Sequence, residues 1–179
     1  SSWVGDSSYP SGITNNRWEN MFGGDGFWTF ADPSDPRYLY AEAQGGNIGR
    51  VDRQTHTYRD IQPKPNYKEK LRWNWNTPIA LSPTDKNTLY IGAQFLFRTR
   101  DHGQTWDRLS PDLTTNDPQK QLQEQSGGIT VDNSAAEMHT TIYAISESPK
   151  DHDVIWVGTD DGNVQVTRDG GKSWKNVAA

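Results

Sequence analysis

Apolar residues in this chain come in short runs that Gly, Pro, Asn and Asp interrupt every few positions. Short runs rich in Tyr, Trp, Val, Ile and Thr, bounded by turn-forming residues, are typical of β-strands. One stretch, residues 117–125, is compatible with a helix, but it lacks the apolar stripe that a packed helix needs. The pattern therefore predicts an all-β chain.

Three segments of the chain repeat the same order of residues. Each contains a Pro that is followed seven positions later by an aromatic residue, and a second aromatic residue comes 18, 16 or 18 positions after the first. The aromatic pairs are Tyr40 and Tyr58, Tyr90 and Trp106, and Trp156 and Trp174. The shorter spacing of the middle pair arises at residues 94–95, a predicted turn, where a repeat tolerates a change of length. Repetition at this period decides the fold.

Each repeat, with the run before its Pro, supplies four short strands joined by tight turns, which is the pattern of an antiparallel meander. The first strand of the first repeat, FWTF at 27–30, is apolar on both faces, so its sheet needs a packed layer on each side. Sheets repeated around an axis give a β-propeller, which closes with 4 to 8 blades. We therefore predict a β-propeller segment of about three four-stranded antiparallel blades, as part of a larger ring or an assembling fragment. The alternative is an open stack of three sheets whose outer faces are covered.

The predicted organisation is one propeller segment over residues 1–179. Residues 1–25, which are rich in turns and contain two Trp, are expected to connect from a preceding blade. The remaining expected parts are blade one at 26–61, blade two at 77–109, a long loop at 110–140 and blade three at 141–177. The expected partners are other propeller blades, either in a longer chain or by self-association, because open blade faces expose much apolar surface.

Composition and charge exclude several functional classes. The net charge of −5 argues against a nucleic-acid-binding face, which would be basic. The absence of Cys excludes disulfides and thiolate zinc sites, and no apolar run approaches the 18 residues of a membrane span. The four His lack a ligand spacing, and residues 159–163 are too short for an EF-hand loop. No metal site and no cofactor are predicted.

Two turns between third and fourth strands share the pattern [ST]-x-D-x-G-x-[TS]-W, at 99–106 and 167–174. The Asp can accept backbone N–H groups across the turn, the Gly supplies a positive φ, and the Trp packs beneath. The residues of the pattern are Thr99, Asp101, Gly103 and Trp106 in blade two and Thr167, Asp169, Gly171 and Trp174 in blade three. The matching turn of blade one, at 51–58, lacks this Asp and Gly. We interpret the pattern as structural.

The turn resembles the Asp-box (BNR) hairpin of sialidases, sortilin-like receptors, xyloglucanases and photosystem-assembly propellers. Segments such as WNWNTPIALSPTDKNTLYIGA and IWVGTDDGNVQVTRDGGKSW, and nearly the whole chain, resemble the large secreted bacterial propeller proteins labelled sortilin-like or glycosyl hydrolase BNR repeat. The resemblance implies further blades on both sides of the segment and a role in protein or glycan binding. It also implies a secreted, periplasmic or cell-surface location, with the export signal outside these residues.

Propeller ligands usually meet the face where the inner strands begin, and three loops expected there, 1–25, 62–76 and 110–140, are long. The candidate ligand-binding residues in and beside them are Asp25, Trp73, Trp75, Asn76 and His139. In a glycan site the Trp rings would stack on sugar faces while the polar groups bond hydroxyls. Strand neighbours alternate, so one of the two Trp is expected to face the channel. The alternative is that the Trp rings pack between blades and Asp25 caps its turn.

The preferred hypothesis is a non-catalytic segment for binding or scaffolding, with protein or glycan ligands. The alternative is part of a glycoside hydrolase whose remaining catalytic residues lie outside this chain, and a third hypothesis is a unit that only assembles. No catalytic residue is assigned, and the candidates under the alternative are Asp25 and Glu137. An inverting glycosidase needs two carboxylates about 6.5–9.5 Å apart. Two facing carboxylates in an open cleft would favour chemistry, and a single Asp among aromatic rings would favour binding.

Overall fold

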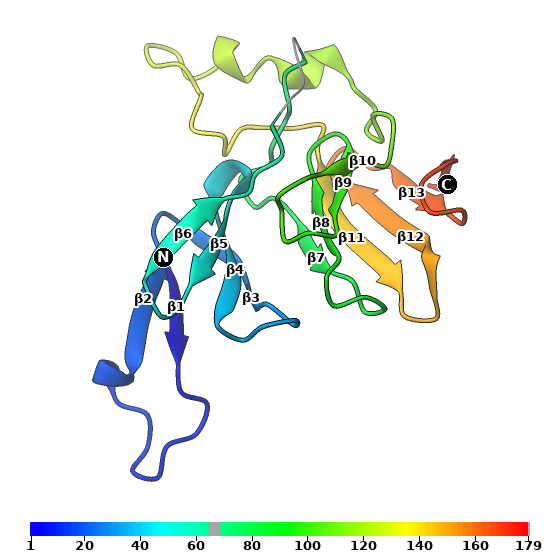
Figure 1. Cartoon of the computed structure of the whole chain (residues 1–179). Helices are drawn as coiled ribbons and strands as arrows, with labels where there is room; N and C mark the ends of the chain where they lie inside the picture. The colour runs from blue at the N-terminus through cyan, green and yellow to red at the C-terminus, as the bar shows by residue number, and fades with distance from the viewer. Residues whose placement is uncertain (65–68, 179) are drawn as a thin grey trace.

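A computed structural model describes residues 1–64 and 69–178, and the chain is all β in these ranges. Three four-stranded antiparallel sheets follow one another along the chain, preceded by a two-stranded hairpin (Figure 1). The helical segments of the described ranges are short 3₁₀ turns at Asn15–Arg17, Gln44–Gly46, Pro118–Gln121 and Gln123–Gln125. No helix in those ranges has the length and hydrophobicity needed to cross a bilayer. The predicted three antiparallel sheets are therefore confirmed.

Each sheet is a meander whose strands keep the order of the chain. Blade one consists of β3 (Gly26–Ala31), β4 (Tyr38–Ala43), β5 (Asn47–Asp52) and β6 (Thr57–Asp60). Blade two consists of β7 (Ile79–Leu81), β8 (Leu89–Gly92), β9 (Leu96–Thr99) and β10 (Asp107–Arg108). Blade three consists of β11 (Ile142–Ser148), β12 (Asp151–Thr159), β13 (Val164–Thr167) and β14 (Lys175–Asn176).

The hydrophobic core lies between the blades, because side chains alternate between the two faces of every strand. Tyr40 of β4 faces blade two, whereas its neighbours Leu39 and Ala41 face the other way. The core between blades one and two contains Tyr40, Ile48, Ile61, Ile79, Leu89, Ile91, Ala93, Phe95 and Phe97. The core between blades two and three contains Tyr90, Leu96, Leu113, Ile142, Ile155 and Val157. Each blade therefore depends on its neighbour for burial of its apolar residues.

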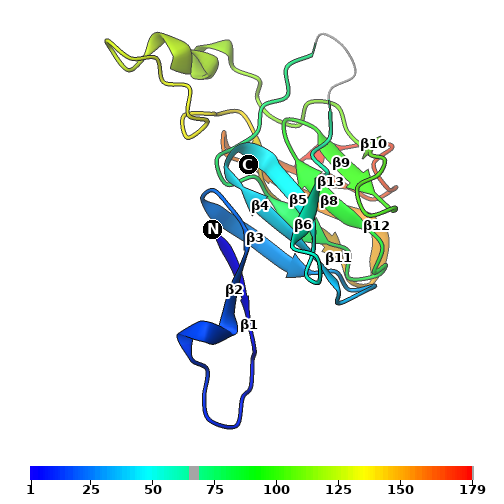
Figure 2. The same ribbon diagram turned by 60° about the vertical axis from the view of Figure 1, so that its left-hand side comes forward.

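A hairpin that the sequence analysis did not anticipate covers the other face of blade one. It consists of β1 (Ser2–Gly5) and β2 (Trp18–Phe22), paired antiparallel. Met21 and Phe22 of this hairpin pack against Leu39, Ala41 and Val51 of the sheet. Its connecting loop projects to one side of the molecule, and residues 110–140 extend on the opposite side (Figure 1, Figure 2). A face of blade one that would otherwise be open is thus buried within this chain.

The inner strand β3 is more exposed to solvent than its apolar sequence predicts. The FWTF run is apolar, yet Trp28 is 40% exposed and Thr29 is also exposed. The expectation of two dry faces therefore fails for this strand, although it holds for β4 and β8, whose residues are nearly all buried. The physical reason is position: β3 is an edge strand of its sheet, and no blade lies beyond it in the described chain.

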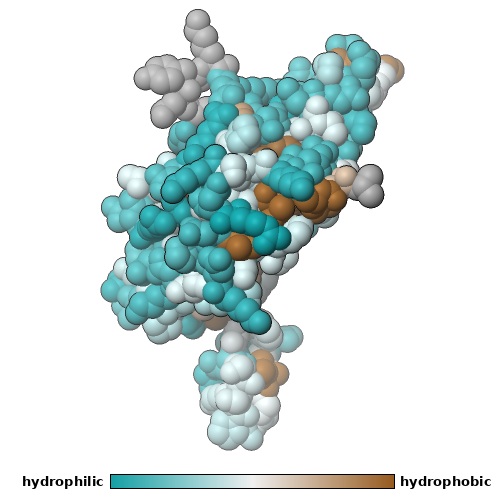
Figure 3. Space-filling model, turned by 90° about the vertical axis from the view of Figure 1, so that its right-hand side faces the viewer, coloured by the Kyte–Doolittle hydropathy of each residue, from teal (hydrophilic) through white to brown (hydrophobic). Residues whose placement is uncertain are grey.

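The outer face of blade three repeats the faces that are buried elsewhere in the molecule. Tyr40, Tyr90 and Trp156 each lie seven residues after the repeat Pro, and the two Tyr are buried against the following blade. Trp156 instead is 40% exposed. Figure 3 looks at this side and shows hydrophobic residues gathered in a patch on it. Blade three therefore presents an inter-blade surface that nothing covers in the described chain.

Candidate functional site

The two turns with the pattern [ST]-x-D-x-G-x-[TS]-W are held by the same hydrogen bonds. In blade two, Asp101 Oδ1 accepts the Thr99 hydroxyl at 2.8 Å and the Thr105 N–H at 2.9 Å, while Oδ2 accepts the Thr105 hydroxyl at 2.6 Å. In blade three, Asp169 makes the equivalent bonds to Thr167 and Ser173. Burial raises the pKa of Asp101, but the hydrogen bonds from Thr105 and Thr99 outweigh it and lower that pKa to about 2. The carboxylates are fully engaged by their own turns.

The same turns fasten each blade to the one before it. Trp106 Nε1–H donates to the Ile61 carbonyl oxygen at 2.8 Å, and Trp174 Nε1–H donates to the Leu109 carbonyl oxygen at 3.1 Å. Ile61 and Leu109 occupy the same repeat position, three residues after the second aromatic residue. Gly103 has a φ of +77°, and a Cβ there would lie 2.6 Å from a side-chain atom of Ile61. The Gly and Trp of the pattern thus serve contact between blades, which supports its structural interpretation.

The degenerate turn of blade one uses a different carboxylate. Asp52 binds Arg37 through both of its oxygens, at 3.0 Å and 2.6 Å, and this pairing lowers the Asp52 pKa. Tyr58, which takes the place of Trp106 and Trp174 in this repeat, meets Phe22 of the hairpin edge to face, with ring centroids 5.1 Å apart. The hairpin therefore receives the aromatic residue that in blades two and three reaches the preceding blade.

Among the predicted ligand-binding residues, Asp25 and Trp75 lie at the same turn. The Asp25 N–H donates to Gln44 Oε1 at 2.8 Å, and the neighbouring Gly45 N–H donates to the Trp75 carbonyl oxygen at 3.1 Å. The Trp75 ring meets Phe27 edge to face, with centroids 6.3 Å apart. Asp25 is exposed and Trp75 partly exposed, so both are accessible at the end of blade one where β3 begins.

Asn76 and His139 approach blade three rather than blade one. Asn74 Oδ1 accepts the Asn76 N–H, and Asn74 Nδ2 donates to Asp160 Oδ2 at 3.2 Å. His139 Nδ1 lies 3.8 Å from Asp160 Oδ1. His139 Nδ1 and Asn76 Oδ1 are buried and have no hydrogen-bonding partner among the described atoms. His139 therefore lies beside Asp160, a residue of the turn that follows β12, whereas Asn76 is linked to Asp160 only through Asn74.

Trp73 and Glu137 are set apart from the others. The Trp73 ring packs on the core between blades one and two, with its centroid 6.1 Å from that of Phe97. A Cβ at Gly46 would lie 3.0 Å from the same ring, so the backbone passes close over it. Glu137 accepts the Ser134 hydroxyl within the long loop. No contact joins Glu137 to Asp25 within residues 1–64 and 69–178.

Glu42 is a buried carboxyl group that sequence reasoning missed. It is fully buried on β4, and neither carboxyl oxygen has a well-aligned hydrogen bond within the described structure. Burial raises its pKa to about 8, although backbone N–H groups of Gly46, Trp28 and Thr77 pull in the opposite direction. The sequence did carry a signal, because Glu42 occupies the repeat position of Gly92 and Gly158.

Asp32 is the centre of a polar network between blades one and two. Its carboxylate accepts bonds from Ser34, from the Tyr40 hydroxyl at 3.1 Å and from Arg50 Nη2 at 2.8 Å. His102 of blade two reaches the same group, with Nδ1 3.0 Å from the Tyr40 oxygen and 3.3 Å from Asp32 Oδ2. Burial raises the Asp32 pKa, but the hydrogen bonds, led by those of Ser34, hold it below its usual value.

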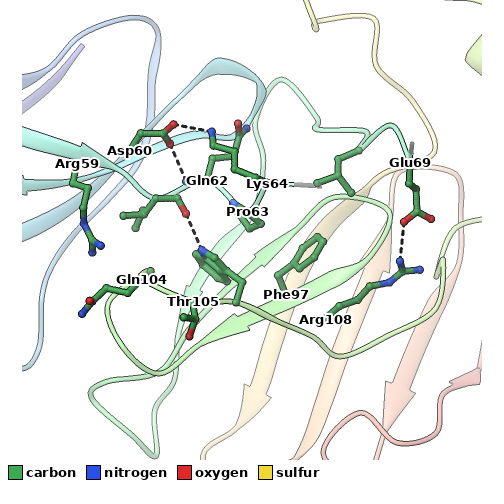
Figure 4. A pocket seen from close by; sticks show the side chains of 14 residues that line it. Arg59, Asp60, Gln62, Pro63, Lys64, Glu69, Phe97, Gln104, Thr105 and Arg108 are labelled. Carbon is green, nitrogen blue, oxygen red and sulfur yellow. Dashed lines mark hydrogen bonds and ion pairs between the residues drawn. The ribbon is translucent and has the colours of Figure 1, made fainter. Parts of the chain in front are cut away.

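A groove of about 550 Å³ runs between the outer strands of blades one and two. Its floor is formed by the apolar side chains of Ile61, Leu71, Phe97 and Trp106. Figure 4 shows Arg59 and Gln104 at one end and Glu69 with Arg108 at the other, with Phe97 and Thr105 between them. Arg108 Nη1 lies 2.8 Å from Glu69 Oε2, so charge is balanced at that end.

The groove combines an apolar floor with a polar rim, as ligand-binding sites do. The groove is not predictable from the sequence, because its lining comes from four separate segments of the chain. The predicted ligand-binding residues do not line this groove; they are Asp25, Trp73, Trp75, Asn76 and His139.

A metal centre has little support in the described ranges. No group of three His, Asp or Glu side chains is placed to hold an ion there. The carboxylates of Asp160 and Asp161 face hydrogen-bond donors, from Thr141 and Asn74 in one case and from Thr159 and Thr115 in the other. A calcium site would surround them with further oxygen acceptors.

Comparison with known proteins shows the fold. No family model and no curated protein matches the chain. Among solved structures, the GH74 enzyme of Niastella koreensis is similar over 90% of this chain, with a TM-score of 0.57 and 16% identity. An ancestral GH74 enzyme is similar over 87%, with a TM-score of 0.51 and 16% identity. The chain covers 25% and 18% of those two chains. At this identity the likeness shows the fold alone, and the fold is that of a β-propeller segment.

Proposed function

We propose that this chain is a non-catalytic, glycan-binding segment of a larger Asp-box propeller of the secreted, sortilin-like kind. The observation that carries the proposal is the groove between blades one and two. Its apolar floor includes the partly exposed Trp106, and planar polar groups line its rim. Aromatic faces with amide, guanidinium and carboxylate groups around them suit sugar rings, which have apolar faces and hydroxyl edges.

The hydrogen-bonding capacity of the rim supports an uncharged polar ligand. Lys64 Nζ lies 2.7 Å from Asp60 Oδ2, and Arg108 pairs with Glu69, so these four charges are balanced before any ligand binds. Gln104 is exposed at the rim. A neutral polyol gains hydrogen bonds from such groups without having to supply a charge.

The scaffold part of the proposal rests on blade three. Its outer face carries Trp156 where the other blades carry Tyr40 and Tyr90, and Val177 where they carry Ile61 and Leu109. The last two supply carbonyl oxygens to the Trp of the following blade. Further blades, in a longer chain or in a second copy, are the partners proposed for this face.

Binding can be tested by calorimetric titration with a xyloglucan oligosaccharide. We expect saturable binding that weakens at least tenfold in the double variant Gln104→Ala/Glu69→Ala, since both residues are exposed on the rim. Gln119→Ala, an exposed change in the long loop, serves as the matched control and should bind normally. Unchanged affinity in the double variant would contradict the groove as the site, and binding of protein ligands but of no glycan would contradict the ligand class.

The second candidate function is part of a glycoside hydrolase, favoured by the likeness to two GH74 enzymes. The same titration mixtures can be assayed for new reducing ends. The non-catalytic proposal predicts none. Hydrolysis that is lost in Asp25→Asn and Glu137→Gln would overturn it in favour of the second candidate.

A further inference from the structure

A second pocket, of about 360 Å³, lies between blades two and three. Its lining residues are Ser82, Thr84, Asp85, Thr88, Tyr90, Arg98, Arg100, Glu147 and His152. It occupies the same place in the repeat as the Asp32 network between blades one and two, because Tyr90 and Arg98 form a cross-strand pair as Tyr40 and Arg50 do.

The two places differ in one carboxylate. Between blades one and two, Asp32 Oδ2 accepts hydrogen bonds from Arg50 Nε at 3.2 Å and from Arg50 Nη2 at 2.8 Å. Asp32 directly precedes the repeat Pro, and the residue at that position in blade two is Ser82. Blade two therefore has the arginine of the pair without the carboxylate that faces it in blade one.

Without that carboxylate, one N–H group of Arg98 lacks an acceptor in the described structure. Its side chain is only 14% exposed, and its Nε is buried with no hydrogen-bonding partner among the atoms described. Its Nη2 lies 3.5 Å from Oδ2 of Asp107, on the outer strand of the same blade. A buried N–H without an acceptor is unfavourable, and for a guanidinium group the strongest acceptor is a carboxylate.

The acidic groups of the pocket do not accept the Nε–H of Arg98 in the described structure. Glu147 accepts the Tyr90 hydroxyl at 2.6 Å, the Ser82 hydroxyl at 2.9 Å and the Thr84 hydroxyl, and it makes no ion pair with Arg98 in the described structure. Asp85 accepts the Thr88 hydroxyl and a backbone N–H of its own turn. Their oxygens are engaged, whereas Arg98 Nε is not.

The other charged residues of the lining leave room for an anion. Arg100 is exposed at the pocket, and His152 Nε2 lies 3.6 Å from an oxygen of Asp153. Within the lining, Arg98 and Arg100 face the two carboxylates of Glu147 and Asp85, and Asp107 approaches Arg98 through Nη2 and leaves Nε without an acceptor in the described structure.

We propose that this pocket binds the carboxylate group of a small organic acid, with Arg98 Nε donating to it as Arg50 Nε donates to Asp32. Ser82, Thr84 and Thr88 also line the pocket, and their hydroxyl groups donate to Glu147 and Asp85. The ligand class is a small carboxylic acid in its ionised form. This site is independent of the glycan groove, which lies at the other blade interface.

The arginine Nε–H resonances of the whole chain give a direct test by ¹H–¹⁵N NMR. Sodium acetate is titrated against sodium chloride at constant ionic strength, with neutral acetamide and inorganic phosphate as comparison probes. We expect a saturable shift of the Arg98 Nε–H with acetate and none with acetamide. Arg50 is the internal control and should not shift, because Asp32 already accepts its Nε–H.

The double variant Ser82→Asp/Glu147→Leu places at the interface of blades two and three the residues that the first interface has, Asp32 and Leu81, at the same repeat positions. Its Arg98 Nε–H is expected to resonate near the acetate-bound position without acetate and to respond no further. Ser8→Asp, an exposed change in the hairpin loop, controls for the added charge and should keep the acetate response.

Three results would overturn the assignment. The first is no saturable shift of Arg98 in the unmodified chain, which decides the question even if the double variant does not fold. The second is a parallel, non-saturating shift of Arg98 and Arg50, which indicates general anion screening. The third is saturation with phosphate but not with acetate, which indicates an inorganic anion site.

Discussion

Replacing Asp32 by Ala is expected to lower the free energy of unfolding by about 3–4 kcal/mol. The Asp32 side chain is fully buried, and its removal leaves the Arg50 guanidinium and the Tyr40 hydroxyl without their acceptor. Breaking a buried ion pair from one side has this cost because an uncompensated charge stays in the interior. Urea unfolding followed by circular dichroism measures the change.

Two further variants serve as a control and as a rescue for the Asp32→Ala change. Asp6→Ala removes an exposed carboxylate that lies 4.0 Å from Arg17, and it should change stability by less than about 0.5 kcal/mol. Asp32→Ala/Arg50→Met removes both charges and should recover part of the loss. If Asp32→Ala unfolds at the same urea concentration as Asp6→Ala, the network does not hold blades one and two together.

Replacing Glu42 by Gln is expected to remove a pH dependence of stability between pH 4.5 and 8. Burial raises the Glu42 pKa from 4.5 to about 8, so in this range the folded state holds a proton that the unfolded state releases. The free energy of unfolding of the unmodified chain therefore falls as pH rises from 4.5 to 8 and levels off above it. At pH 7 the accumulated loss is about 3 kcal/mol, from 1.36 kcal/mol per pH unit.

The comparison of Glu42→Gln with the unmodified chain isolates this group. All other titratable groups are present in both proteins, so their contributions cancel in the difference. Glu19→Gln, an exposed change on β2, is the matched control and should leave the pH profile unchanged. Parallel stability curves for Glu42→Gln and the unmodified chain from pH 5 to 8 would show that Glu42 titrates normally and is not held in a dry interior.

Both effects arise where one blade meets the next, which is where this chain concentrates its polar chemistry. The Asp32 network joins blades one and two, and Glu147 joins blades two and three through Tyr90. The indole N–H groups of Trp106 and Trp174 add a hydrogen bond at each of these interfaces. Apolar packing alone would let sheets slide over one another, whereas directed hydrogen bonds fix their register.

The repeat made much of the fold predictable from the sequence. The spacing from Pro to Tyr40, Tyr90 and Trp156 located the second strand of every blade, because the aromatic residue of the face between blades recurs wherever the sheet recurs. The role of Asp101 in its turn was also predictable, because its hydrogen bonds to Thr99 and Thr105 lie within a few consecutive residues.

Features that depend on distant contacts were not predictable. The hairpin β1–β2 closes over a loop of residues 6–17 without a turn signature at its strands, so its pairing is visible only in the structure. Of the two Trp beside Asn74, Trp73 lies on the inter-blade core and Trp75 on the accessible face, a choice that alternation left open. His102 lies 62 residues from Tyr40, and no local pattern links them.

The same difference between local sequence patterns and distant contacts separates the predicted ligand-binding residues from the groove. Asp25, Trp75, Asn76 and His139 were chosen from their loops, and their role remains a prediction. The groove draws on Ile61, Phe97 and Trp106, which the sequence marked only as strand and turn residues.

The most direct test of the account is hydrogen exchange at the indole Nε1–H groups, followed by NMR. If the three sheets stack as successive blades, Trp106 and Trp174 donate to Ile61 and Leu109 of the preceding blade, and their indole protons should exchange as slowly as amides in the central strands. Trp3, which is 53% exposed on the hairpin, provides the rate of an open indole. Exchange of Trp106 and Trp174 at the rate of Trp3 would contradict the stacking of the blades.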